Sequence, residues 1–322
     1  MREARAMKKL THDDYVFGWI AALPEELAAA RAMLDEKHQR LAQRGGDSNI
    51  YTLGSIGDHN IVIAVLPSDG YGTVNAATVA NNMHRTFPSV RDFLMVGIAG
   101  GAGITGNFDV RLGDIVVGDM LIQYDLKKDL LHQAFEIKAI PLRPSERLRH
   151  ALSELRTVHE EEESKVPTYI RQIADGKPKM EKYSNRPQLD LLFEDLYEHS
   201  GADNNCDACD QSKLVKRGRR EHNDPMIHYG VVASGNSLIK DPERRNELVK
   251  RHRAICFEME GAGIIGSLQC LVIRSISDYA DSHKNKVWQP YAASAAAAYA
   301  KELILAMPIS EDQESKVGEC IA

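Results

Sequence analysis

Short apolar runs, each bounded by polar or turn residues, predict buried strands along most of this chain. These runs cover 15–23, 93–99, 112–117, 227–233 and 271–276, and Gly57-Asp58 predicts a hairpin within 51–66. Helical patterns separate them, at 24–34, 74–86, 144–163, 241–252 and 291–307. In an open α/β sheet, ligands bind just beyond the carboxyl ends of the strands. Polar residues at those ends are therefore the first candidates for a functional site.

Carboxylates follow the ends of two predicted strands near the C-terminus. Glu258 and Glu260 lie beside one strand end, and Asp278 closes the strand that begins near Leu271. Buried carboxylates are unfavourable unless they are paired, hydrogen-bonded or protonated. The residue types alone leave two interpretations open, which are surface or salt-bridged acids with a structural role and a cluster that performs chemistry.

A fourth acid, Glu26, follows the first predicted strand. Pro24 is placed where a helix favours its first residue, and Glu25 and Glu26 fall in the first helical turn. Favourable electrostatics at a helix N-terminus explain these acids without any function. The alternative is that Glu26 faces a cleft at the junction of strand and helix.

The central strand at 93–99 runs into a glycine-rich turn at Gly100-Gly101. Glycine at this place lets a ligand approach the backbone closely. The turn lacks the spacing of a dinucleotide-binding fingerprint, and no Gly-Lys-Ser/Thr triplet of a phosphate-binding Walker loop is present.

Composition limits the class of protein. The chain has 322 residues, of which 43% are hydrophobic and 27% charged, as in a soluble globular protein with a sizeable core. A net charge of -6 argues against a general nucleic-acid or membrane binder. Five cysteines and no apolar secretory signal favour a reducing, cytoplasmic compartment. We expect no cofactor and no metal.

Residues 164–225 are polar and weakly periodic, and we interpret them as an insertion into a single domain that spans 15–307. Residues 1–14 are expected to form a flexible arm, and 308–322 a polar tail or linker. The insertion contains Cys206 and Cys209, which are weak evidence for zinc because a structural site needs about four ligands. His199 and His222 could complete such a site, but free thiols or a labile disulfide are favoured.

The insertion also carries a basic run at 216–220, which includes Arg217, Arg219 and Arg220. Such runs are usually solvated surface, but arginines also bind phosphate groups. Both interpretations stay open from the sequence.

Six segments in order give the chain a resemblance to the nucleoside phosphorylase/nucleosidase superfamily, which contains purine nucleoside phosphorylase and methylthioadenosine/S-adenosylhomocysteine nucleosidase. The segments are 18–26, 96–101, 111–117, 233–236, 257–260 and 276–278. The chain looks most like the fungal version of this domain, often found at the N-terminus of longer proteins with nucleotide-binding switch or repeat domains. The resemblance implies an α/β fold with three layers (α/β/α) and a mixed, partly barrel-like central sheet.

The resemblance also implies cleavage of the bond between purine and ribose, with roles for individual residues. Asp278 would be the general acid that protonates purine N7, which requires that burial keep it protonated. Glu26 would activate water, and Glu260 would hold the ribose hydroxyls. The remaining substrate-binding candidates are Met259, Glu258, Gly100, Gly101, Ile98, Leu238, Ile239 and Ser277.

Hydrolysis is favoured over phosphorolysis. Phosphorylases of this superfamily bind phosphate through an early Gly-Asp-Pro/Arg loop, and here that loop reads Ala-Leu-Pro-Glu-Glu. An Arg and a Ser of the phosphorylases correspond to Met95 and Ile98. Ile98 also departs from the small polar residue usual in the nucleosidases.

The substrate is predicted to be an adenine nucleotide or nucleoside. Leu238 replaces the phenylalanine that stacks on the purine in nucleosidases of the methylthioadenosine type. Lys240, Arg217, Arg219 and Arg220 would bind phosphates, because relatives in immune-type proteins cleave adenine from adenosine nucleotides, including ATP.

Two other functions are kept as alternatives, a phosphorylase and a non-catalytic nucleotide-sensing module. Nucleic-acid depurination is disfavoured, since no aromatic and basic stacking surface is evident. The superfamily implies a homodimer or a larger homo-oligomer.

Overall fold

The computed structural model describes residues 10–129, 135–137, 140–201 and 205–309. Within these residues, nine strands form the main sheet in the order β12-β11-β8-β13-β5-β1-β4-β3-β2. Their bounds are β1 Phe17–Ala21, β2 Glu36–Lys37, β3 Thr52–Ile56, β4 His59–Val65, β5 Asp92–Gly101, β8 Ile115–Gln123, β11 Ile227–Ser234, β12 Ala254–Glu258 and β13 Cys270–Asp278. The sheet is mixed, because β13 is parallel to β5 and antiparallel to β8.

One end of the sheet curls back and closes on its own centre. β12 is parallel to β11 on one side and antiparallel to the end of β5 on the other, with Cys256 opposite Gly101 and Phe257 opposite Gly100. This second pairing confirms the mixed, partly barrel-like sheet. It also brings the carboxyl ends of β5, β12 and β13 to one place.

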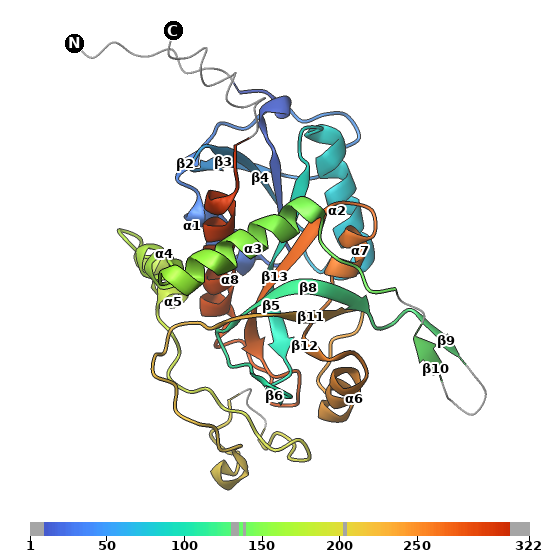
Figure 1. Cartoon of the computed structure of the whole chain (residues 1–322), viewed down its shortest axis with the longest axis vertical. Coiled ribbons are helices and arrows are strands. Elements are labelled where there is room, and N and C mark those ends of the chain that lie inside the picture. The colour runs from blue at the N-terminus through green and yellow to red at the C-terminus, as the bar shows by residue number, and fades with distance from the viewer. Residues whose placement is uncertain (1–9, 130–134, 138–139, 202–204, 310–322) are drawn as a thin grey trace.

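Helices cover both faces of the sheet (Figure 1). α8 (Gln289–Ala306) packs on β5 and β13 and contacts α1 (Pro24–Met33) and α3 (Glu146–Glu161). α2 (Thr73–Thr86) packs on β1 and β4 and contacts α7 (Gly261–Ile265), while α6 (Pro242–His252) lies against β11 and β12. The alanines of α8 are buried along most of its length, which allows a close approach to the sheet.

The predicted insertion has two parts. Its first part forms α4 (Val166–Gln172) and α5 (Glu181–Ser184), which pack on α8 and bury Val166, Ile170 and Tyr183 in the main core. Its second part follows an irregular path (Figure 1), with a small separate core of Phe193, Cys206 and Cys209.

The shorter elements complete the architecture. Two-stranded ribbons are formed by β6 (Ile104–Thr105) with β7 (Phe108–Asp109), and by β9 (Lys127–Asp129) with β10 (Phe135–Ile137), which projects from the body in Figure 1. Single 3-10 turns are η1 (His12–Asp14), η3 (Pro178–Met180) and η4 (Gln211–Lys213).

Most predicted elements appear within a few residues of their expected bounds. The first strand is shorter than the apolar run at 15–23, since β1 ends at Ala21 before Pro24 begins α1. The helix at 241–252 is less exposed than its charge indicates, because Arg245 and Leu248 are buried. Residues 1–9 and 310–322 of the predicted arm and tail lie outside the described residues. No helix in the described part of the chain is long and apolar enough to cross a bilayer.

Candidate active site

Glu26 is held at the end of β1 by three backbone amides. Its Oε2 accepts hydrogen bonds from the N–H groups of Ala22 (2.6 Å) and Leu23 (3.0 Å), and its Oε1 accepts one from Ile98 at 2.8 Å. Pro24 starts the helix two residues earlier, so Glu26 lies in the first turn and folds back over the helix N-terminus toward β5. The side chain is only 3% exposed. Its position is therefore fixed by the backbone of the turn that follows β1 and by that of β5.

Gly97 provides the space that the Glu26 carboxyl group occupies. A Cβ atom built on Gly97 would lie 2.1 Å from Oε1 and 2.4 Å from Cδ of Glu26. No side chain fits at such a distance, so β5 needs a glycine here for the carboxyl group to reach the Ile98 amide.

Arg274 is the centre of a buried ionic cluster. This residue lies within β13, is 1% exposed, and pairs with Glu258 and, at 3.2 Å, with Glu260. Its Nη1 lies 3.9 Å from Oε1 of Glu26. One guanidinium thus faces three buried carboxyl groups, so charge neutralisation within the cluster is incomplete when all three are ionised.

This excess of acids changes the proton affinity of the cluster. Burial raises the pKa of Glu26 above its ordinary value, against the opposing effects of Arg274 and the three amides. Burial also raises the pKa of Glu260 to about 7; Arg274 opposes this shift, whereas Glu258 and Glu26 add to it. A group that titrates close to neutrality can exchange a proton during a reaction.

Glu258 and Glu260 have different surroundings at the start of α7. Both oxygens of Glu258 accept the N–H of Gly261, and Oε2 also accepts the N–H of Glu260 at 3.1 Å. Glu260 instead contacts the amide of Gly72, at 3.4 Å, on the loop before α2. Glu258 is thus saturated by the protein, whereas Glu260 bridges to a loop with fewer contacts.

Asp278 ends β13 and is 4% exposed. Its Oδ1 accepts the N–H of Ala280 at 3.0 Å, and its Oδ2 accepts the hydroxyl of Ser277 at 2.9 Å. Lys284, on the following loop, places its Nζ 2.5 Å from Oδ2. The carboxyl group is therefore paired with a partly exposed ammonium group that can carry a proton.

The two groups of acids converge on the end of β5. Gly100 is opposite Phe257 on one side and Asp278 on the other, and a Cβ at Gly100 would lie 2.9 Å from Oδ1 of Asp278. Gly101 is equally restricted, by the Cγ2 atom of Ile276 at 2.7 Å. The acids are buried, so they are not surface acids, and their ion pairs fit the interpretation as salt-bridged acids. A chemical role stays a prediction.

The remaining predicted substrate residues surround this end of the sheet with different exposure. Met259 and Ile98 are half-buried, and Ile239 is buried in a small core with Phe257. Leu238, which was predicted to contact the substrate in place of a stacking phenylalanine, is 55% exposed.

Two arginines of the basic run form ion pairs with acidic residues of the same chain. Arg217 pairs with Asp190 at 3.0 Å and donates to the hydroxyl of Tyr279 at 2.7 Å. Arg220 pairs with the buried Asp114 at 2.6 Å, and His228 contacts the same carboxylate. The interpretation of the run as purely solvated surface is therefore wrong for these two residues, and their phosphate-binding role stays a prediction.

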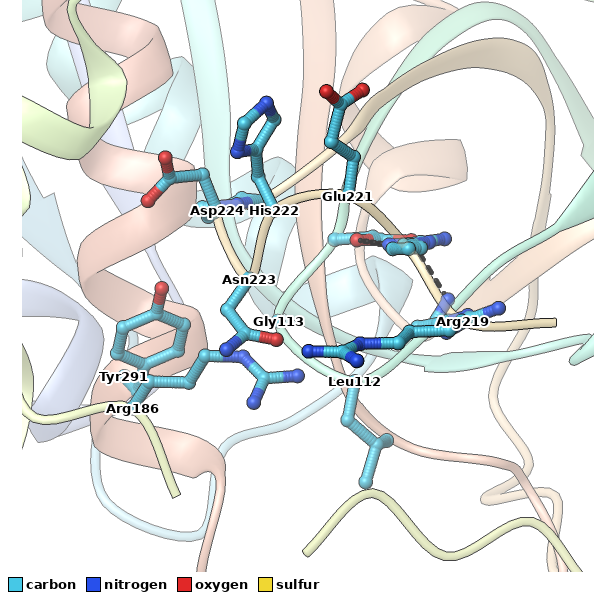
Figure 2. A pocket seen from close by; sticks show the side chains of 13 residues that line it. Leu112, Gly113, Arg186, Arg219, Glu221, His222, Asn223, Asp224 and Tyr291 are labelled. Atoms are coloured by element: carbon cyan, nitrogen blue, oxygen red, sulfur yellow. Dashed lines mark hydrogen bonds and ion pairs between the residues drawn. The ribbon is translucent and has the colours of Figure 1, made fainter. Parts of the chain in front are cut away.

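Arg219 lies in a different environment from those two. It is exposed and lines a cavity of about 180 Å³ together with Arg111, Arg186 and Tyr291 (Figure 2). His222 also lines this cavity and is not part of the group that His199 forms with the two cysteines. Lys240 is exposed just before α6.

Sequence reasoning did not single out Arg274, Gly97 or Lys284 as members of the site. Arg274 could have been found, because a charged residue inside the apolar run of β13 needs a buried partner. Nothing in the sequence marks Lys284, since it lies in an irregular loop rich in polar residues.

The family model described as the phosphorylase superfamily matches residues 16–176. The chain belongs to this superfamily. An NLR-like (nucleotide-binding leucine-rich repeat) protein from Hyaloscypha variabilis is 40% identical over 302 residues; the match covers 92% of the chain and 30% of that protein. The chain thus spans less than a third of that relative.

Two further proteins are similar to the chain over nearly their whole lengths. A 5'-methylthioadenosine/S-adenosylhomocysteine nucleosidase from Mycobacterium tuberculosis is 26% identical, with 91% of the chain and 96% of that protein covered. The structure of futalosine hydrolase from Helicobacter pylori superposes with a TM-score of 0.57 at 20% identity, covering 91% of the chain and 99% of that structure. This second match supports the fold.

Proposed function

We propose that the chain is a nucleosidase that hydrolyses the bond between adenine and ribose in an adenine nucleotide or nucleoside. The observation that carries this proposal is the convergence of Glu26, Glu260 and Asp278 on one end of the sheet. The similarity to a methylthioadenosine/S-adenosylhomocysteine nucleosidase supports the same reaction class. The proposed catalytic domain spans 15–307, with the insertion at 164–225 as part of it.

In the proposed reaction the C–N bond breaks and its electron pair leaves with the purine. The proton that reaches purine N7 comes from the Lys284 ammonium group, 2.5 Å from Oδ2 of Asp278, and is passed on by the Asp278 carboxyl group. Water adds hydroxide to C1′ and gives its proton to Glu26. The raised pKa of Glu26 suits a base that must accept and later release a proton.

The sugar would bind at Glu260. Once ionised, its carboxylate accepts hydrogen bonds from the ribose 2′- and 3′-hydroxyls, and the half-buried Met259 packs beneath the ring. Glu258 acts as a support, because it is saturated by Arg274 and the α7 amides. As positive charge develops on the ribose, the excess of carboxylates around Arg274 stabilises it.

The base would lie against the backbone at Gly100 and Gly101, with Ile98, Ser277, Leu238 and Ile239 around it. For a nucleotide substrate, Arg219 and Lys240 are exposed and able to bind phosphate, whereas Arg217 and Arg220 would first have to leave their acidic partners. We also propose that the domain acts as an effector in an immune-type protein, because its 40% identical relative is an NLR-like protein.

Product analysis by chromatography tests the proposal. ATP, AMP, adenosine and methylthioadenosine are each incubated with the protein, with and without inorganic phosphate. We expect free adenine without phosphate, and its loss in Asp278→Asn. Adenine released only with phosphate would instead establish a phosphorylase and remove the water-activating role of Glu26. Bound but intact nucleotide would establish the sensing module.

A further inference from the structure

The insertion brings together a group of metal-binding side chains that the proposed reaction does not use. The Sγ atoms of Cys206 and Cys209 and a ring nitrogen of His199 all lie within 4.8 Å of one another. Both thiols are buried, and neither is in a disulfide. A tetrahedral zinc ion separates neighbouring Cys and His ligand atoms by roughly 3.3–3.8 Å, as its bond lengths dictate. Small side-chain adjustments therefore suffice to surround an ion.

The hydrogen bond of His199 leaves its other ring nitrogen available. Nε2 lies 2.7 Å from the carbonyl oxygen of Asn205, which only accepts, so Nε2 carries the proton. Nδ1 then has its lone pair free. Such a bond from the far nitrogen to a carbonyl is the usual way in which a metal-binding histidine is oriented.

A fourth candidate comes from outside the insertion. His283 is buried, and neither of its ring nitrogens has a hydrogen-bond partner among the described residues. Its ring centroid lies 4.2 Å from that of Phe193, on which it stacks, and 5.5 Å from that of His199. It does not belong to the group of three within 4.8 Å, so its side chain has to move to reach an ion bound there. The Oδ1 atom of Asp281 lies 3.7 Å from the Nδ1 atom of His283, which is too far for a hydrogen bond, and a buried imidazole that makes no hydrogen bond is unfavourable. A metal ion would give this ring a partner.

We propose that Cys206, Cys209, His199 and His283 bind one structural zinc ion. Thiolate and imidazole ligands select zinc over magnesium or calcium, which prefer oxygen. The local apolar core consists of Phe193 and the two cysteines with Leu191, Tyr197 and Leu214 packed against them. Such a small core needs an additional cross-link to hold an irregular segment. The ion supplies it and ties the insertion to the loop that carries Lys284.

Metal content of the full chain, purified without chelator under reducing conditions, tests the site. We expect one zinc per chain in the wild type, none in Cys206→Ser/Cys209→Ser, and a loss of bound zinc in His283→Ala. His222→Ala is the matched control, since it changes an exposed histidine of the same insertion. It should keep its zinc.

A second measurement does not depend on whether the variants fold. Wild-type protein stripped with EDTA is titrated with Co²⁺, and visible absorption typical of tetrahedral cobalt–thiolate coordination is expected. EDTA should also lower the melting temperature of the wild type. Folded wild type that contains no zinc and develops no cobalt absorption would overturn the proposal, as would a Cys206–Cys209 disulfide found by mass spectrometry. Neither result depends on nucleosidase activity.

Discussion

At the scale of single residues, the site depends on which of its buried carboxyl groups are protonated and which are paired with a positive charge. Arg274 faces Glu26, Glu258 and Glu260, and burial makes each unpaired carboxylate unfavourable. Asp278 is separate from this cluster and pairs with Lys284. The proposed acid and the proposed base therefore draw on different proton sources, which lets both act in one turnover.

Replacing Lys284 tests its role beside Asp278. We expect Lys284→Met to lower kcat for adenine release by about 10²-fold or more, because the acid loses its proton source. Lys284→Arg should retain part of the activity. Lys286→Met, at an exposed lysine two residues further on, is the control and should keep full activity. Equal activity in Lys284→Met and wild type would show that Asp278 acts without it.

The raised pKa of Glu260 makes the free energy of unfolding depend on pH. Its pKa is about 7 in the folded protein, against an ordinary value of 4.5 for glutamate. Between these values the folded chain holds a proton that the unfolded chain has released, so this contribution to stability is complete below about pH 4.5 and is lost as pH rises through about 7. Thermal melts across this range should show the wild type losing stability relative to Glu260→Gln as pH rises. Parallel curves would contradict the raised pKa.

Gly97 tests the placement of Glu26. In Gly97→Ala the new Cβ would overlap Oε1 of Glu26, so the carboxyl group must leave the Ile98 amide. A displacement of this size lowers activity by about 10²-fold. Gly45→Ala adds a methyl group where no atom lies within 4 Å, and it should be neutral. Adenine release by both variants, together with their circular dichroism spectra, gives the comparison.

At the scale of elements, α2 and α7 pack through backbone contact. A Cβ on Gly263 would lie 1.9 Å from the carbonyl oxygen of Thr73, so α7 approaches the first turn of α2 too closely for any side chain. Glu260 is the residue just before α7, and Gly72 just before α2 contacts it. This helix contact therefore sets the position of the proposed ribose anchor.

Gly263→Ala should separate the two helices. We expect a loss of about 1–3 kcal/mol in the free energy of unfolding, as for an overpacked core, and a higher KM from the displaced Glu260. Gly266→Ala, in the same segment but with no atom within 4 Å of its new Cβ, is the matched control. Chemical denaturation and steady-state kinetics measure the two effects. Identical curves for both variants would disprove the tight contact.

At the scale of the whole molecule, the predicted α/β fold with a mixed, partly barrel-like sheet is confirmed. Strand ends and helix starts could be predicted because Pro24, the Gly57-Asp58 turn and the apolar runs act locally. The pairing of β12 with β5 could not, since it joins Phe257 to a glycine far away in the sequence. The same holds for the ion pairs of Arg217 and Arg220, whose acidic partners lie on other segments.

Assembly stays a prediction at this scale. The resemblance to the superfamily implies a homodimer or a larger homo-oligomer. Light scattering coupled to size-exclusion chromatography should therefore give at least twice the mass of the single chain. A monomer with full activity would show that each chain holds a complete site.

The closed end of the sheet has a consequence for how substrate choice can change. Gly100 lies between the strand that leads to Glu260 and the strand that ends in Asp278, so the registers of these two strands with β5 fix the separation of the proposed ribose-binding and proton-donating residues. We expect point substitutions on the surrounding loops to leave these two strand registers unchanged. The loop before α6 can therefore diverge to accept different 5′ groups, while the position of the proposed scissile bond stays the same.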